Sequence, residues 1–558
     1  MTIKRMAALC LTLVLLLALA ACGGSPAQTP ASGTDTPAAD APTTDASDSS
    51  AAADAASDAT SAGPAALTLP LAEGAELSMW WPVGSNTWMW IKDDYNDMLA
   101  YQEMERRTGV HINWQHPNAD TAAEQLSLML LAEDYTDFIW LGETYSYPSG
   151  NPAAVADGVF IGLNELIDQY MPNYYDWLYN RGTDEYRRNS SLDDGTIWAF
   201  SHVTRDAEPA WRGIFFREDI TSAAGLSDPV TLDDWYAVLQ AFKAAGIEAP
   251  LVPDANGTFT DSEFLTAFGV ANGMYQVDGQ VQYGFVQEGL RDYLALMNQW
   301  YSEGLLYQEF ATPELQFGDF ATKVGALASV GYGIGLNRMQ LMGFTDEAIN
   351  LKAVRAPVRQ AGDEIHVRQT NSVVRGAAVL TAGCENQALA AQWMDYQYSE
   401  EGMLLNNYGI EGVTYDLDEN GEPQFTQAFL DECEGQNAQG VQSRYNRQGD
   451  GPGWVEYAMR YKYPPEITWD CAQQCQIWQQ DDDSWVISPF VTMTADESAA
   501  YASIMSNIDT YVNESLPKFI MGVRPLDEFD SYVKDIWAMG LQNAIDLQQA
   551  ALDRYNAR

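Results

Sequence analysis

The stretch AELSMWWPVG, residues 75–84, begins the part of the sequence that decides the fold. Its first half predicts a strand over Glu76–Trp81, and Pro82–Gly84 predicts the turn that ends it. Apolar residues at helical spacing follow and predict a helix that ends near Gly109. The next segment, VHINWQ at 110–115, is typical of a second strand.

A second helix and a third strand complete this unit. Residues 122–132 carry apolar side chains on one helical face, and DFIWLG at 137–142 is typical of a buried strand. The order strand, helix, strand, helix, strand predicts a parallel sheet with right-handed crossovers. Ligands of such sheets bind beyond the carboxyl ends of the strands. We therefore expect the binding site near Trp80–Trp81 and near Glu143–Tyr145.

The rest of the chain alternates between strand-like and helix-like segments and shows no internal repeat. The capped start at Thr231 predicts a helix, and the segment 386–409 predicts a pair of helices. Two closing helices are predicted over Asp496–Asn513 and Leu526–Tyr555. The whole pattern favours an α/β protein, and its length favours more than one lobe.

The first 22 residues are typical of an export signal. Lys4 and Arg5 precede an apolar run, and LAACG at residues 19–23 resembles a bacterial lipobox. This resemblance implies that Cys22 is acylated and becomes the first residue of the mature protein. An ordinary signal peptide that contains a cysteine is the alternative. Residues 23–73, rich in Ala, Thr, Ser, Asp and Pro, predict a disordered linker that lifts the folded part off a membrane.

Charge and aromatic content restrict the possible partners. The formal net charge is -49, which argues against nucleic acid and anionic polymers as ligands. The sequence holds 17 Trp and 29 Tyr, more than a core of this size usually needs. Because aromatic rings stack on the apolar faces of sugar rings, this excess favours a carbohydrate ligand.

The sequence gives little reason to expect a metal or another cofactor. Four cysteines remain after the signal, and no histidine accompanies them at zinc-site spacing: Cys384, Cys433, Cys471 and Cys475. Three disulfide connectivities are open to them. The run Asp416–Gly421 resembles half a calcium loop, but Gln427 stands where a bidentate glutamate is needed. We predict a polar hairpin turn there instead.

Five longer segments, taken in order, carry a family resemblance. They are VADGVFIGLNELIDQYMPNY (155–174), DDGTIWAF (193–200), FFREDITSAAGLSDPVTLDDWYAVLQAFK (215–243), SEEGMLLNNYGIEGVTYDLDENGEP (399–423) and YVNESLPKFIMGVRPLDEFDSYVKDIWAMGL (511–541). With them the chain resembles the extracellular solute-binding proteins of ABC importers, in the lipoprotein branch linked to oligosaccharide uptake in Gram-positive bacteria. The relatives' calcium loop is not matched after residue 243.

The resemblance implies a two-lobe periplasmic-binding-protein-like fold with the ligand in a cleft. Lobe 1 would comprise residues 74–202 and return at 355–410, and lobe 2 would comprise 203–354 and return at 411–558. The implied function is a monomeric, lipid-anchored protein on the outer face of the cytoplasmic membrane. It would bind an oligosaccharide and deliver it to ABC permease subunits, without cofactor or nucleic acid.

Two other functions stay open at this point. A surface protein that binds glycans without transport would share the anchor and the aromatic content. A glycoside hydrolase would need two carboxylates across the scissile bond, and 78 Asp and Glu residues make such pairs uninformative. No motif for a zinc protease, a nucleophile elbow or a phosphate loop occurs, so we predict no enzyme and no catalytic residue.

Candidate ligand-binding residues follow from the strand ends, the lobe crossings and the glycine-rich loops. They are Trp80, Trp81, Asn86, Trp88, Glu143, Tyr145, Trp211, Arg212, Tyr332 and Trp454. We expect Arg217 to serve in a structural ion pair. The strongly negative chain favours a neutral sugar. Three arginines near the first crossing, where the chain first passes from lobe 1 to lobe 2, could reverse this preference: Arg205, Arg212 and Arg217.

Overall fold

The computed structural model describes most of residues 63–558. Gaps in this range lie at 83–92, 119, 143–144, 149, 183, 206–211, 254–262, 313–314, 316–318, 332–348, 367–373, 435, 437, 447–450, 465–466, 468–473, 475 and 481. The predicted signal and lipobox, Cys22 and most of the predicted linker lie outside the described residues.

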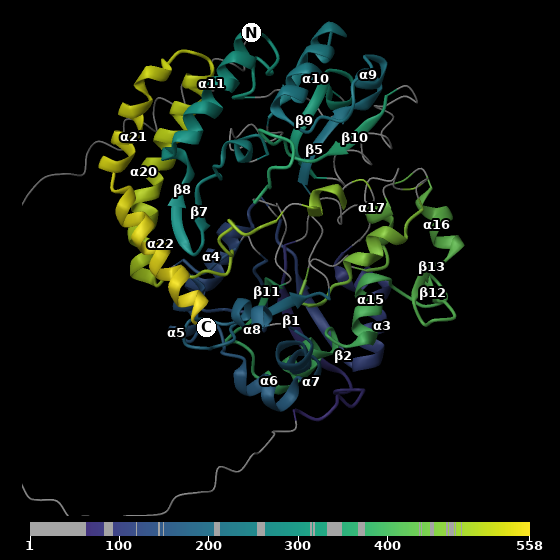
Figure 1. The fold of residues 1–558 in the computed structure, drawn as a ribbon. Coiled ribbons are helices and arrows are strands. Elements are labelled where there is room, and N and C mark those ends of the chain that lie inside the picture. Colours follow the sequence, from purple (N-terminus) through teal and green to yellow (C-terminus); the bar gives the residue numbers. More distant parts are fainter. Residues whose placement is uncertain are drawn as a thin grey trace, which may run out of the picture. The chain divides into compact units, whose positions relative to one another are not determined.

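A six-stranded sheet contains the predicted N-terminal unit (Figure 1). Its order is β14 (Gly453–Trp454), β4 (Phe200–Val203), β11 (Val374–Leu380), β3 (Phe138–Trp140), β1 (Ala75–Trp80) and β2 (Val110–Gln115). Strands β2 and β3 pair in parallel with β1, as predicted. Strand β11 is antiparallel to both of its neighbours, and β14 is parallel to β4. Five strands therefore run in one direction and β11 runs in the other.

A four-stranded sheet is built from the middle of the chain. Its order is β10 (Leu351–Val354), β5 (Arg212–Arg217), β9 (Val324–Gly331) and β6 (Ala249–Val252). Strand β5 is antiparallel to β10 and β9, and β6 is parallel to β9. Two hairpins complete the strands: β7 (Met274–Val277) with β8 (Gln280–Tyr283), and β12 (Tyr415–Leu417) with β13 (Pro423–Phe425).

Helices pack on these sheets. Around the first sheet are α3 (Leu99–Thr108), α4 (Ala122–Ala132), α5 (Asn151–Ala156), α6 (Asn164–Tyr170), α7 (Pro172–Asp176), α8 (Asp184–Ser190), α14 (Gln387–Tyr396), α15 (Glu400–Asn407), α16 (Gln427–Cys433) and α17 (Ala438–Gln442). With the second sheet are α9 (Glu218–Ala223), α10 (Leu232–Ala244), α11 (Glu288–Ser302), α12 (Asp319–Thr322), α20 (Ala495–Ile520), α21 (Phe529–Ala538) and α22 (Leu541–Asn556). Helix α20 packs against both α11 and α22 (Figure 1).

Short 3₁₀ or π segments join several of these helices and strands. They are η1 (Tyr95–Asp97), η2 (Trp177–Arg181), η3 (Leu265–Phe268), η4 (Gly284–Val286), η6 (Tyr457–Lys462), η7 (Gln476–Gln480) and η8 (Leu526–Glu528). The predicted α/β class is confirmed. No helix in the described ranges has both the length and the apolar composition to cross a membrane.

The two sheets have separate hydrophobic cores. Both faces of the first sheet are covered, since Trp81 belongs to one cluster of buried side chains and Trp80 to another. The core of the second sheet takes buried side chains from 214–354 and again from 505–544. The sequence assigned residues 411–558 to lobe 2, but the buried side chains of the described residues in 415–467 pack in the first core. The exact positions of the other lobe boundaries stay a prediction.

Local sequence signals account for several helix ends. Thr231 begins α10 with a capping box, because its hydroxyl accepts from the Asp234 N–H while the Asp234 carboxylate accepts from the Thr231 N–H. The predicted helix Ala122–Ala132 agrees with α4. The predicted helix Leu526–Tyr555 is wrong, because Gly540 adopts φ 98° and separates α21 from α22.

The hairpin prediction for Asp416–Gly421 is confirmed. One carboxylate oxygen of Asp418 accepts from the backbone N–H of Asn420 at 2.8 Å and of Glu422 at 3.0 Å, which closes the turn between β12 and β13. Cys384 and Cys433 are buried free thiols. Burial raises the pKa of each to about 12, while Cys471 and Cys475 lie outside the described residues.

Candidate functional site

The five like-directed strands of the first sheet end at one edge, which we call the carboxyl edge. Strand β1 ends at Trp80, β3 at Trp140 and β14 at Trp454, while β2 ends at Gln115 and β4 at Val203. Three of the five strands therefore place an indole at this edge, where the ligands of parallel sheets bind.

Aromatic side chains contact one another along the carboxyl edge. The rings of Trp81 and Trp140 are stacked, with centroids 5.4 Å apart and planes 6° apart. Tyr145 packs edge-on against Trp80 at 5.6 Å and against Trp140 at 6.2 Å. Trp140 and Tyr145 keep part of their surface exposed, so this cluster has both a buried layer and an accessible layer.

His116 ties the ends of β1 and β2 together beneath this cluster. Its Nδ1 lies 2.8 Å from the Trp81 carbonyl oxygen, and the Tyr95 N–H donates to its Nε2 at 3.3 Å. The neutral tautomer with the proton on Nδ1 satisfies both contacts. Burial lowers the pKa of His116, which keeps the ring neutral. The imidazole thus acts as a fixed support for Trp81.

The turn after β3 requires glycine at residue 142. Gly142 has φ 54°, and a Cβ there would lie 2.6 Å from the Trp140 ring. The turn therefore lets Trp140 fold back over the backbone, where it can stack on Trp81.

A second group of side chains surrounds Trp454 at the other end of the sheet. The ring packs edge-on against Trp177 at 5.1 Å, and the guanidinium groups of Arg205 and Arg181 lie 5.0 and 5.6 Å from its centroid. Glu456 holds Arg205 through a 2.7 Å ion pair. The Trp454 ring itself is only 3% exposed, so it supports the two arginines more than it presents a surface.

The structure assigns the predicted site residues to three groups. Trp80, Trp81, Tyr145 and Trp454 lie at the carboxyl edge, whereas Arg212 is the first residue of β5 in the other sheet. Five predicted residues lie outside the described ranges: Asn86, Trp88, Glu143, Trp211 and Tyr332. Trp80 and Trp81 are 3% and 4% exposed, so their rings belong to the two cores rather than to an open platform.

Sequence reasoning missed two aromatic residues of this edge. Trp140 lies in the predicted strand 137–142 and Trp114 in the predicted strand 110–115. Both stand near the carboxyl end of their strand, which is the criterion that selected Trp80. Arg205 was named from the sequence as a possible contact for an acidic sugar, but its contact with Trp454, which spans about half the chain, had no local signal.

Two of the three arginines near the first crossing, Arg205 and Arg217, are paired with carboxylates. Arg217 makes a bidentate pair with Asp219, with contacts of 2.8 and 2.6 Å, which is the predicted structural ion pair. Arg205 is held by Glu456 as described above. At the carboxyl edge the aromatic faces therefore lie beside an arginine, Arg205, whose charge Glu456 compensates.

Comparison with known proteins gives the family context. A family model for bacterial extracellular solute-binding proteins matches residues 91–404. The fructooligosaccharide ABC transporter substrate-binding protein FusA of Streptococcus pneumoniae is 25% identical over 496 residues, which cover 83% of this chain and 88% of FusA.

Solved structures share the fold. An HMO-binding, ABC-transporter-associated solute-binding protein from Bifidobacterium longum infantis has a TM-score of 0.70 at 17% identity and covers 86% of this chain and 99% of its own. The alginate-binding protein AlgQ2, without calcium ion, has a TM-score of 0.67 at 21% identity and covers 86% of this chain and 98% of its own. These structures confirm the predicted two-lobe α/β fold class.

Proposed function

Because this chain belongs to the bacterial extracellular solute-binding proteins, we propose that it captures an oligosaccharide outside the cell and delivers it to an ABC importer. The relative FusA, named for fructooligosaccharide and for an ABC transporter, supports both parts of the proposal. The chain acts by binding and release.

The observation that carries the proposal is the stacked pair Trp81 and Trp140 at the carboxyl edge. A sugar ring presents a flat apolar face with polar groups around it, and a partly exposed indole backed by a second indole is a rigid surface for that face. Trp114 and Tyr145 add further aromatic surface beside the pair. In a two-lobe protein this edge faces the cleft, and lobe closure would cover the bound sugar.

We further propose that the ligand is neutral. Two of the three arginines near the first crossing are already compensated, Arg205 by Glu456 and Arg217 by Asp219. The net charge of -49 raises the cost of bringing an acidic sugar into the site. A neutral oligosaccharide avoids that cost.

The proposal includes a lipid anchor at Cys22 and a place on the outer face of the cytoplasmic membrane. The sequence LAACG at residues 19–23 and the long polar segment after it support this. Several acyl chains on one cysteine give stable anchoring, because each buried CH₂ contributes about 0.8 kcal/mol. We propose that the chain works as a monomer beside its permease subunits.

A glycan panel tests this function. The protein is titrated with neutral oligosaccharides such as kestose and with alginate oligomers at two salt concentrations, and binding is followed by calorimetry. We expect at least one neutral oligosaccharide to bind with micromolar or tighter affinity. Binding of acidic members alone, weakened by salt, would overturn the neutral assignment but not the binding function.

The same incubations separate binding from catalysis. We expect chromatography to recover the bound sugar unchanged after prolonged incubation with the protein. Steady turnover of the bound sugar would contradict the proposal and support a glycoside hydrolase.

A further inference from the structure

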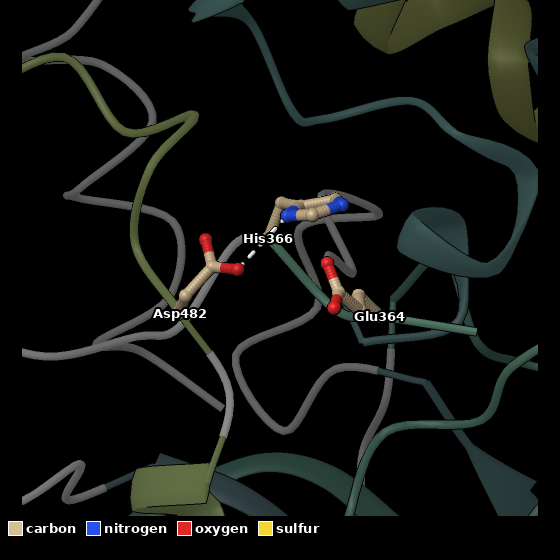
Figure 2. Close-up of side chains that lie close together, drawn as sticks. All are labelled: Glu364, His366 and Asp482. Carbon is tan, nitrogen blue, oxygen red and sulfur yellow. Dashed lines mark hydrogen bonds and ion pairs between the residues drawn. The ribbon is translucent and has the colours of Figure 1, made fainter. Parts of the chain in front are cut away.

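Three potential metal ligands converge outside the carboxyl edge. Figure 2 shows the side chains of Glu364, His366 and Asp482 pointing toward one another, the first two from one segment and the third from another. One ligand atom from each residue lies within 4.8 Å of the others. The Nδ1 of His366 is 2.9 Å from the Oδ2 of Asp482.

The backbone holds these side chains in place. The Asp482 N–H donates to the Ile365 carbonyl at 3.0 Å, and the Trp485 N–H donates to the His366 carbonyl at 3.2 Å. The Trp485 ring stacks on the His366 ring with centroids 4.9 Å apart. The Ser484 N–H donates to Asp482 Oδ1 at 2.9 Å, which leaves Oδ2 directed at the imidazole. Such supporting contacts orient ligands at metal sites.

The geometry fits a small ion of the zinc class. Ligand atoms around a tetrahedral zinc ion are roughly 3.3 Å apart, so the three side chains need only small rotations to enclose one. One imidazole with two carboxylates suits zinc better than calcium, which prefers a set of six to eight oxygen atoms. Three protein ligands leave the fourth position for water.

An entry route lies beside the cluster. A cavity of about 360 Å³ is lined by Glu364 and His366 together with Trp485, Arg359 and Thr266. His366 keeps 29% of its side chain exposed and Asp482 keeps 48%. Solvent and ions therefore reach the ligand atoms without opening either core.

The cluster also joins two connecting segments of the fold. Glu364 and His366 lie between β10 of the second sheet and β11 of the first. Asp482 lies between Ile467, in the first core, and α20, which packs in the second. A metal ion here would cross-link two of the segments along which the chain passes from one core to the other.

We propose that Glu364, His366 and Asp482 form a binding site for a divalent transition-metal ion of the zinc class. The ion bridges residues 364–366 to residue 482 and restrains the connecting segments against each other. The site is separate from the proposed sugar site.

Calorimetric titration with zinc chloride tests the site. The full chain in detergent is treated with chelator, and its accessible thiols are alkylated so that cysteines outside the described ranges do not bind zinc. We expect one equivalent of zinc to bind with micromolar affinity and to raise the melting temperature, as any ligand selective for the native state does. Calcium at the same concentration should leave the melting temperature unchanged.

Variants identify the ligands. His366→Gln and Asp482→Asn should each weaken zinc binding about tenfold or more and remove the zinc-dependent rise in melting temperature. His111→Gln is the matched control, because His111 Nδ1 forms the same 2.9 Å contact with Glu105. The control should bind zinc as the parent does. Melting without zinc checks that each variant is folded.

Two results would overturn the proposal. One is the absence of saturable zinc binding in the parent protein. The other is equal zinc affinity in the parent and in both folded variants, which would place the ion elsewhere.

Discussion

Nη2 of Arg558 lies 2.7 Å from Oδ1 of Asp193, and this contact joins the segment after α22 to the segment after α8. The same guanidinium donates to the carbonyl oxygens of Ser191 at 2.7 Å and Phe490 at 3.1 Å. Helix α8 packs in the first core, through Tyr186, and α22 begins in the second. The Arg558 side chain, only 3% exposed, therefore links elements of both cores.

We predict that Arg558→Ala lowers the free energy of unfolding by about 3 kcal/mol, because it leaves two carbonyl groups without their donor and leaves Asp193 paired with Arg554 alone. Urea unfolding followed by circular dichroism measures this. Arg106→Ala is the control, since the Arg106 side chain is 70% exposed and its pair with Glu103 is local. The control should unfold at the parent's urea concentration. Equal midpoints for all three proteins would contradict a stabilising role of Arg558.

Asp395 makes stability depend on pH. The residue is fully buried in α14 and accepts from the N–H groups of Asn173 at 3.2 Å and Tyr174 at 2.8 Å, at the start of α7. Burial outweighs these hydrogen bonds and raises the pKa of the carboxyl to about 7. The folded chain then keeps a proton that the unfolded chain releases near pH 4.

The contribution of Asp395 to stability is therefore complete below about pH 4 and is lost as the pH rises toward 7, by up to about 1.4 kcal/mol per pH unit. We predict that the unfolding free energy of the parent, measured in urea, falls relative to that of Asp395→Asn between pH 5 and pH 7. A difference that is the same at both pH values would show that the carboxyl does not titrate in this range.

Cys22 carries the proposed anchor. We predict that Cys22→Ser moves the protein from the membrane fraction to the medium, or leaves it unprocessed, because acylation needs the thiol. Immunoblots of membrane and medium fractions distinguish these forms from the parent. An unchanged membrane fraction with a processed N-terminus would mean that another feature anchors the chain.

Sequence patterns predicted those helices and helix ends that are determined by residues close together along the chain. The apolar spacing of residues 122–132 and the cap at Thr231 are examples, because neighbours along the chain decide both. The break at Gly540 was missed because apolar residues continue at helical spacing on both sides of it. A single glycine in the left-handed conformation overrides that periodicity.

Contacts across long sequence distances were not predictable in this way. The two-residue strand β14 pairs with β4 some 250 positions earlier, and no local pattern announces it. The aromatic excess indicated a sugar site, but it could not show that Trp80 and Trp454 are buried while Trp140 keeps some exposure. Burial of a ring depends on what the rest of the chain places over it.

The central claim is that a sugar ring stacks on the aromatic cluster at the carboxyl edge. Calorimetric titration of Trp140→Ala with the tightest-binding oligosaccharide of the panel tests it most directly. Trp537→Ala is the matched control, because that indole is 41% exposed on α21, which packs in the second core. Melting curves confirm that both variants are folded.

We predict that Trp140→Ala loses about 2 kcal/mol of binding free energy, roughly a thirtyfold loss of affinity, while Trp537→Ala binds as the parent does. Parent-like affinity in folded Trp140→Ala would contradict the claim that the sugar binds at this edge.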